Sequence, residues 1–177
     1  MKIFIVTIYN SLNAGAYLQA YALSAFLKRL GFEACFLKTK ARKPFLRSMV
    51  SIMRSVMRFR FKEACFQLTK LWNFWKAVRR FTTCSLSATS ERDVFVFGSD
   101  EIWNISRKDI RDYPVLYGEG IPRGYWASYA PTINNTSLED LKANRGFVES
   151  LNKFDKISVR DKHSQDCLSV VTKKDVS

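Results

Sequence analysis

The sequence predicts an α/β fold: a Rossmann-like three-layer α/β/α domain built on a parallel sheet. Short apolar runs at 2–8, 32–37 and 94–97 are rich in β-branched and aromatic residues, which is typical of buried strands. A helix of ordinary length separates the first two runs, and polar turns follow the first and third. At 177 residues the chain is long enough to bury the core of one ordinary domain.

The first strand–helix–strand unit occupies residues 2–37. After the run 2–8, residues 16–30 carry strong helix formers with apolar side chains at helical spacing, and Gly31 follows as a helix stop. Two parallel strands joined in this way predict a right-handed crossover. The intervening turn contains only Gly15, so the three-glycine dinucleotide fingerprint is absent.

The next strand, 94–97, ends in a sharp turn at Gly98. Glycine lets the backbone turn and lets a ligand approach closely. Ser99, Asp100 and Asn104 then fall where ligands bind in open α/β sheets, at the carboxyl ends of strands. A strand-to-helix turn capped by Ser99 or Asp100 explains the same pattern about as well.

The remaining elements complete the predicted sheet. Residues 108–122 carry two prolines and two glycines and predict a loop, and 123–129 predicts a further strand. A capping pattern opens a helix over 137–151. A last strand is expected at 156–159, with Arg160 at its carboxyl end.

Positive charge is concentrated in one segment. The chain has a formal net charge of +13, and residues 38–80 hold thirteen basic residues and one acidic residue, Glu63. This segment has a helical apolar pattern, so we expect a basic amphipathic helical insert at 40–89. The Rossmann-like domain then comprises residues 1–39 and 90–177.

The basic insert has three interpretations. A basic amphipathic helix is typical of binding to an anionic membrane surface or an acidic glycan. Basic residues interleaved with aromatic ones can also hold single-stranded nucleic acid, although the chain carries no signature of a nucleic-acid module, and no nucleic-acid partner is expected. The third interpretation is a helical excursion that packs its apolar face on the sheet and leaves its arginines solvated.

The residue inventory excludes several chemistries. His163, expected at the start of a surface helix, is the one histidine, so a His-rich metal site is excluded and no metal or cofactor is expected. The four cysteines are scattered without a C-x-x-C motif and form no disulfide framework, which suits a reducing cytosol. The first apolar run is too short for a signal peptide, and no run reaches transmembrane length. We therefore expect a cytoplasmic protein. If the basic insert binds an anionic membrane surface, the protein would also contact the inner face of the membrane peripherally.

Four short motifs, in order along the chain, resemble those of the polysaccharide pyruvyl transferase family. Residues 13–23 resemble its N-x-G-A-x-L-Q-x-Y-A-L motif, and residues 98–104 resemble G-S-D-Q-x-W-N. Residues 125–130 are similar to Y-A-A-S-F-G, and residues 154–161 to F-D-x-I-S-V-R-E. Together the four motifs are far more specific than any one of them.

Three residues depart from the family pattern. Ala14 replaces an aromatic residue, and Pro131 follows the third motif where small, flexible residues are usual. Glu101 replaces glutamine, which changes the hydrogen bonding of that side chain from mixed to acceptor-only.

The resemblance implies a larger GT-B-like fold of two domains with the active site between them. This chain resembles the N-terminal half, and the C-terminal half is absent from it, so we expect the chain alone to be inactive. The alternative is a non-catalytic truncated remnant or a binding module, whose basic insert docks on a membrane surface or an acidic polymer.

The reaction implied by the resemblance moves pyruvate from phosphoenolpyruvate onto sugar hydroxyls of a polysaccharide or a lipid-linked sugar, forming a ketal. Phosphoenolpyruvate is a donor substrate here, not a cofactor. Arg160 suits the donor's phosphate and carboxylate, since a guanidinium binds both in bidentate fashion. The alternative role for Arg160 is an ion pair with Asp155 or Asp161. Asp100 and Glu101 are the candidate catalytic carboxylates, with helix capping as the alternative.

The candidate acceptor-binding residues lie within or beside the first three motifs: Asn13, Gly15, Gln19, Gly98, Ser99, Trp103, Asn104 and Ser128. Trp103 is included because an indole stacks well on a sugar ring. Core packing is the simpler interpretation of that residue.

Overall fold

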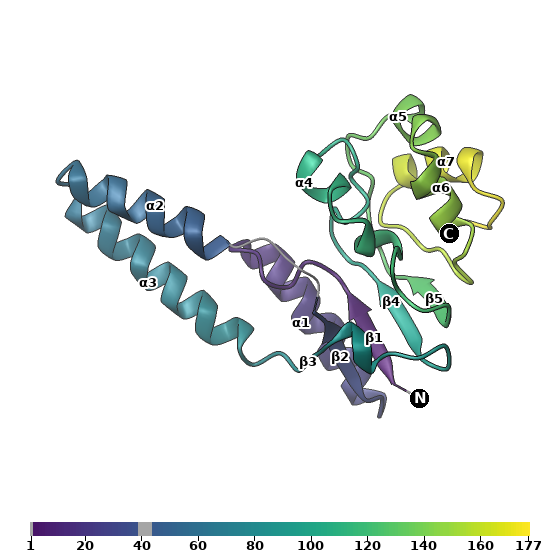
Figure 1. Ribbon diagram of the computed structural model, residues 1–177, viewed down its shortest axis with the longest axis horizontal. Coiled ribbons are helices and arrows are strands. Elements are labelled where there is room, and N and C mark those ends of the chain that lie inside the picture. Colours follow the sequence, from purple (N-terminus) through teal and green to yellow (C-terminus); the bar gives the residue numbers. More distant parts are fainter. Residues whose placement is uncertain (1, 39–43) are drawn as a thin grey trace.

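The computed structural model describes residues 2–38 and 44–177, and within them five parallel strands form one sheet (Figure 1). The strands are β1 (Ile3–Val6), β2 (Ala34–Leu37), β3 (Thr83–Cys84), β4 (Val94–Phe97) and β5 (Tyr125–Ser128). Their order in the sheet is β3-β2-β1-β4-β5. The predicted α/β class and the parallel sheet are therefore confirmed.

The sheet order reverses between β1 and β4. The chain moves outward from β1 to β2 and β3, then returns to place β4 on the other side of β1. In the register of the sheet, Ile3 of β1 lies between Ala34 of β2 and Val94 of β4. The carboxyl ends of β1 and β4 therefore lie side by side at the point of reversal, which is where open α/β sheets bind ligands.

The helices of the described residues include three long ones, α1 (Ala14–Arg29), α2 (Pro44–Met57) and α3 (Phe61–Val78). The shorter ones are η1 (Leu86–Ala88), α4 (Lys108–Arg111), η2 (Pro114–Tyr117), α5 (Leu138–Ala143), α6 (Arg145–Leu151) and α7 (Lys162–Val171). α1 begins at Asn13, whose side chain accepts a hydrogen bond from the Gly15 amide at 3.0 Å. Across these residues, none of the helices has the length and apolar character needed to cross a bilayer.

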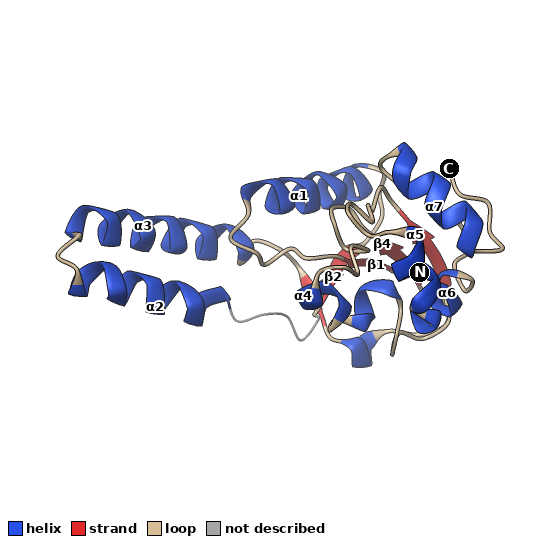
Figure 2. Cartoon of the chain, turned by 90° about the horizontal axis from the view of Figure 1, so that it is seen from above, coloured by secondary structure: helices blue, strands red, loops and turns tan. Residues whose placement is uncertain are grey.

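Helices cover both faces of the sheet (Figure 2). α1 packs Ala20, Leu23 and Leu27 against the face that contains Ile5 and Phe36. The other face buries a larger cluster, which includes residues of α4, α5, α6 and α7. Aromatic side chains dominate that larger cluster, with ring centroids 4.7 to 6.2 Å apart among Phe97, Trp103, Trp126, Phe147 and Phe154.

α2 and α3 form an antiparallel hairpin that projects away from the sheet (Figures 1 and 2). Ile52, Ala64 and Leu71 are buried between the two helices. After α3 the chain returns to the edge of the sheet as β3, which pairs with β2. The range 40–89 therefore contains one strand of the sheet in addition to the helical pair.

Two elements differ from the sequence-based prediction. The helix expected over 137–151 is interrupted at Asn144, whose side chain accepts from the Phe147 amide and starts a second helix. The last strand expected at 156–159 is wrong: the structure has only isolated bridges at Lys156 and Ile157. The reason is the Ser128 side chain, which takes the place of backbone partners by donating to the carbonyl of Ser158 and accepting from its amide, both at 2.9 Å.

A third segment also differs from the prediction: the loop expected over 108–122 contains α4 and η2. Both elements bury apolar side chains in the larger cluster, including Ile110 and Leu116. Packing against the sheet thus orders a stretch in which prolines and glycines indicated only turns.

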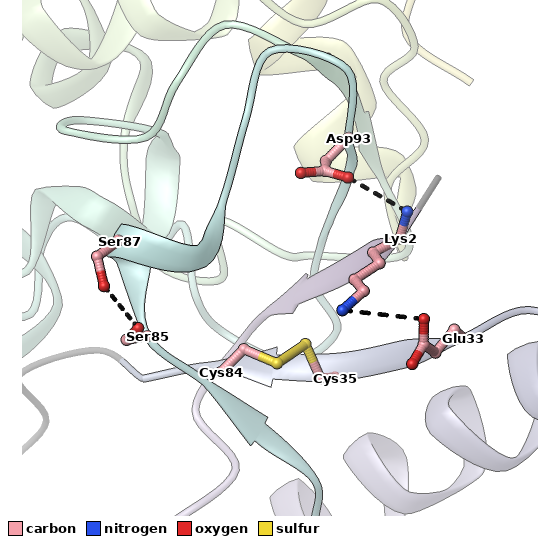
Figure 3. Close-up of a disulfide and its surroundings, with 7 residues drawn as sticks. All are labelled: Lys2, Glu33, Cys35, Cys84, Ser85, Ser87 and Asp93. Carbon is pink, nitrogen blue, oxygen red and sulfur yellow. Dashed lines mark hydrogen bonds and ion pairs between the residues drawn. A yellow bond between two sulfur atoms is a disulfide. The ribbon is translucent and has the colours of Figure 1, made fainter.

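A disulfide joins Cys35 of β2 to Cys84 of β3, with the two Cα atoms 6.0 Å apart (Figure 3). The expectation of no disulfide among the scattered cysteines is wrong for this pair, because the two residues are 49 positions apart in the sequence and no local motif marks them. The parallel pairing of β2 and β3 brings them together. Cys65 and Cys167 are free thiols.

We expect Phe97→Ala to destabilise the domain by about 3–5 kcal/mol, because Phe97 is fully buried and its removal leaves a cavity beside Trp126 and Phe154. Urea denaturation followed by circular dichroism measures the change. The matched control is Phe66→Ala on α3, where the side chain is 71% exposed and the expected change is within about 0.5 kcal/mol. Equal effects of the two substitutions would contradict the assigned core.

Candidate functional site

The candidate site lies at the carboxyl ends of β1 and β4, where the sheet order reverses. β4 ends at Phe97, and the next residue, Gly98, is buried and has a φ of +127°. A side chain there would collide with the carbonyl oxygen of Tyr129 on the neighbouring segment. Pairing with that segment resumes at Asp100, whose carbonyl accepts from the Thr132 amide at 3.0 Å. The predicted need for glycine at this turn thus has two steric causes: the backbone angle and the close neighbouring carbonyl.

The side chain of Gln19, on α1, joins two of the other segments at this edge. Its Oε1 accepts from the Ser99 hydroxyl at 2.8 Å and from Nη2 of Arg160 at 2.9 Å. These residues are 80 and 141 positions from Gln19 in the sequence. The fold therefore brings together one residue from each of three of the motifs.

Arg160 is exposed, and its guanidinium forms no ion pair with any carboxylate in residues 2–38 and 44–177. Its backbone amide donates to the carbonyl of Pro131 at 3.1 Å, which fixes the main chain against the end of β5. The hydrogen bond to Gln19 occupies one of the five N–H groups of the Arg160 guanidinium. The remaining donors can therefore bind an anion without first breaking a salt bridge.

Both acidic neighbours of Arg160 have other partners. Asp155 accepts two hydrogen bonds from Arg123, at 2.8 and 2.9 Å, and one from the Trp126 amide at 2.8 Å. Asp161 caps α7 by accepting from the Ser164 amide at 2.8 Å. In the described residues, Arg160 therefore forms no ion pair with Asp155 or Asp161, which was the alternative role considered for it.

These partners also lower the pKa of Asp155. The hydrogen bonds from Arg123 are the main cause, and the Trp126 amide and the nearby positive charges act in the same direction against a smaller effect of burial. Since Asp155 begins the segment that leads to Arg160, its ionised form holds that segment against β5.

Glu101 and Asp100 differ in their surroundings although they are adjacent. Partial burial alone would raise the pKa of Glu101, but hydrogen bonds from Arg107, Asn134 and Asn104 together with the charge of Arg107 outweigh it and lower the pKa. The Arg107 contact measures 3.0 Å. The Asp100 carboxylate accepts no hydrogen bond within the part of the chain that is described, and its backbone has a φ of +80°. Of the two predicted catalytic carboxylates, Asp100 is therefore the one left available.

The other predicted acceptor-binding residues fall into two groups. Asn13 and Gly15 are exposed at the start of α1. Trp103, Asn104 and Ser128 are buried: the Trp103 indole is 0% exposed and donates to the carbonyl of Leu116. A fully buried indole offers no face to a sugar, so core packing is its role in this structure. Asn104 and Ser128 support neighbouring loops through their hydrogen bonds.

Sequence reasoning missed a polar pocket of about 590 Å³ beyond the end of β5. Its lining is Thr132, Asn134, Asn135, Thr136, Ser137, Asp161 and His163. His163 lies near the start of α7, as expected, with Nε2 3.3 Å from the carbonyl of Thr136. The available signal was the run 132–137, five of whose six residues are polar, which is separated from the predicted strand 123–129 by two residues. Polar residues shortly after a strand are also what identified the turn at Gly98. In the described residues no group of three His, Cys, Asp or Glu could hold a metal ion.

Comparison with known proteins gives one result. A family model described as polysaccharide pyruvyl transferase matches residues 13–176, nearly the whole chain. Searches of curated proteins and of solved structures found no match. The matched range includes Gln19, Ser99 and Arg160, which meet at the strand ends, and Asp100, which follows Ser99.

The lowered pKa of Asp155 predicts a specific pH dependence of stability. A carboxylate whose folded pKa lies below its unfolded value of about 3.9 stabilises the protein above that pH and loses the effect as the pH falls through the folded pKa. Asp155→Asn should therefore lower the free energy of unfolding at neutral pH, and its difference from the parent protein should shrink between about pH 5 and pH 2.

Urea unfolding at a series of pH values measures this difference. Asp166→Asn is the control, because it removes an exposed carboxylate whose surface ion pair with Lys162 is worth little. A difference between Asp155→Asn and parent that stays constant with pH would show that Asp155 acts by packing rather than by charge.

Proposed function

The chain belongs to the polysaccharide pyruvyl transferase family, and we propose that it takes part in transferring pyruvate from phosphoenolpyruvate to two hydroxyls of a sugar. The acceptor is a polysaccharide or its lipid-linked precursor, and the product is a cyclic ketal. The observation that carries this proposal is Arg160, an exposed guanidinium without a carboxylate partner among the described residues, held by Gln19 beside the strand-end turn.

The proposed reaction sets three chemical requirements. The first hydroxyl oxygen bonds to the C2 atom of the donor, a proton adds to the methylene carbon, and phosphate leaves as the second hydroxyl bonds to the same C2 atom. The two hydroxyls lose two protons in total: one is balanced by the new methyl group, and the other leaves with phosphate. The site must therefore bind a donor with two anionic groups, supply a proton and accept protons from hydroxyls.

Arg160 meets the first requirement. The donor carries a phosphate and a carboxylate, and a planar guanidinium can form paired hydrogen bonds with either. Gln19 holds one edge of this group at 2.9 Å and is itself bonded to Ser99 at 2.8 Å. The orientation of Arg160 is thus set before a donor binds, which lowers the entropy cost of binding.

Asp100 is the proposed base for an acceptor hydroxyl, because its carboxylate has no protein partner in the described part of the chain. Glu101 is less available to an acceptor hydroxyl, since its carboxylate already accepts from Arg107 and Asn104, and these contacts help to lower its pKa. We assign Glu101 the role of fixing the loop that carries Asp100. A glutamate suits this role because, as an anion, it pairs with Arg107.

The architecture supports a shared cleft. The strand order β3-β2-β1-β4-β5 is that of a Rossmann-like doubly wound sheet, and the site lies at its reversal. We propose that this domain supplies one wall of a GT-B-like cleft, with Asn13, Gly15 and the polar pocket at Thr132–Ser137 facing the sugar acceptor.

We expect Arg160→Lys to weaken phosphoenolpyruvate binding about 10- to 100-fold, because lysine keeps the charge but loses the planar pair of donors. Isothermal titration calorimetry of the chain with phosphoenolpyruvate measures this directly. Gln19→Leu should weaken binding by a smaller factor, since the charge remains but its orientation is lost. Arg145→Lys, on α6, is the matched control and should bind as the parent does.

Thermal unfolding separates binding from stability. Arg160→Lys should leave the melting temperature within a few degrees of the parent, because an exposed arginine contributes little to stability. A large drop in melting temperature with unchanged donor affinity would assign Arg160 a structural role and remove it from the donor site. Phosphate release in the presence of donor and candidate glycans then tests the transfer itself.

A further inference from the structure

The hairpin of α2 and α3 exposes an unusual amount of apolar surface. Its buried contacts are limited to a narrow seam that includes Ile52, Ala64 and Leu71. Outside that seam the following large apolar side chains are between 41% and 82% exposed: Met49, Val50, Met53, Val56, Met57, Phe59, Phe61, Phe66, Leu68, Trp72 and Trp75. Because the hairpin projects away from the sheet, the described domain does not cover this surface (Figure 1).

Most of these side chains share one face of the hairpin. On α2, Met49, Met53 and Val56 recur at spacings of four and three, which places them on one side of the helix. On α3, residues 61, 68, 72 and 75 recur in the same way. The two rows adjoin, since an apolar hollow of about 710 Å³ is lined by Met49, Leu68, Thr69, Leu71, Trp72 and Trp75.

Cationic groups surround this face. Between residues 48 and 80 the sequence holds eight basic residues and one acidic residue, Glu63, which is paired with Arg60. All eight basic residues are exposed. Two of them lie over the exposed indoles: Lys76 Nζ is 5.3 Å from the centre of the Trp72 ring, and Arg79 Cζ is 4.4 Å from that of Trp75.

We propose that this hairpin is a membrane-docking element that lies in the interface of an anionic lipid bilayer. Its apolar face enters the boundary between headgroups and acyl chains, and its cations contact lipid phosphates. Tryptophan is enriched at that depth of a bilayer, and lysine and arginine reach back to the headgroups while their aliphatic stems cover apolar surface.

Charge complementarity selects the bilayer over other partners. If a second copy of this chain packed hairpin against hairpin, two strongly cationic surfaces would meet, and the one acidic residue of each, Glu63, is already paired with Arg60. An acidic polymer would pair with the cations but would leave exposed apolar side chains in water, among them Met53, Met57 and Phe59, each at least 64% exposed. An anionic bilayer satisfies both features at once.

The chain carries its own fluorescent probe of this contact. It has four tryptophans, of which Trp103 and Trp126 are 0% and 2% exposed and Trp72 and Trp75 are 55% and 43% exposed. A shift of the emission to shorter wavelength on binding therefore reports the hairpin. We expect this shift with vesicles of phosphatidylcholine mixed with phosphatidylglycerol, but not with vesicles of phosphatidylcholine alone.

Two double variants separate the apolar and the electrostatic contributions, measured by co-sedimentation with the mixed vesicles. Met53→Glu with Met57→Glu and, separately, Arg58→Glu with Lys62→Glu should each lower vesicle binding at least about tenfold. All four side chains are exposed, so the circular dichroism spectrum and melting temperature should change little.

The matched control is Lys142→Glu with Lys153→Glu, which makes the same change in net charge on the α/β domain, and binding should stay within about threefold of the parent. Three results would each overturn the proposal. The first is equal binding to both kinds of vesicle. The second is binding to the mixed vesicles without a change in tryptophan emission, which is the behaviour of a surface for acidic polymers. The third is a lipid-free dimer that Met53→Glu with Met57→Glu dissociates.

Discussion

The placement of β4 between β1 and β5 is the constraint on which the rest of the domain depends. Phe95 and Phe97 of β4 are fully buried, and each pairs in register with a residue on both neighbouring strands. Because parallel strands have the same direction, their carboxyl ends share one edge of the sheet. The segments after β1, β4 and β5 must therefore pack beside one another, and Gly98 is the position at which that packing is tightest.

The candidate site results from the close packing of the segments that follow β1, β4 and β5. The turn after β4 carries no side chain where it approaches Tyr129, so the next residues, Ser99 and Asp100, can lie against α1 and the segment after β5. Gln19 then links α1 to both Ser99 and Arg160 through a single oxygen. Ser99 and Arg160 are 80 and 141 positions from Gln19 in the sequence, so the strand order is what assembles the candidate site.

The fold class, the first crossover unit and the polar turn at Gly98 could be predicted because each depends on local pattern: continuous apolar runs, helical spacing and a glycine at a strand end. The segment 156–159 could not, since the side chain of Ser128 replaces the backbone partners that would have made it a strand. The bond between Cys35 and Cys84 and the bridge through Gln19 depend on which strands are neighbours. No local pattern contains that information. For Trp103 the local pattern was misleading. The residue lies within a polar motif, but its indole is buried in the core.

Most of the positive charge of this chain lies outside the candidate site at the strand ends. The proposed donor site and the proposed membrane-docking hairpin therefore use different cations. Residues 38–80 contribute +12 of the formal net charge of +13, so the remainder of the chain is nearly neutral. The net charge of a nearly neutral domain does not produce a field strong enough to attract an anionic donor. The donor must therefore be bound by the few cations that lie at the site itself. Arg160, oriented by Gln19, is such a cation. The hairpin's charges are scattered over an exposed surface with apolar side chains between them, an arrangement that fits an extended anionic surface better than a small ligand. One chain thus uses cations in two ways: a single oriented guanidinium at the strand ends, and a diffuse set around an apolar face.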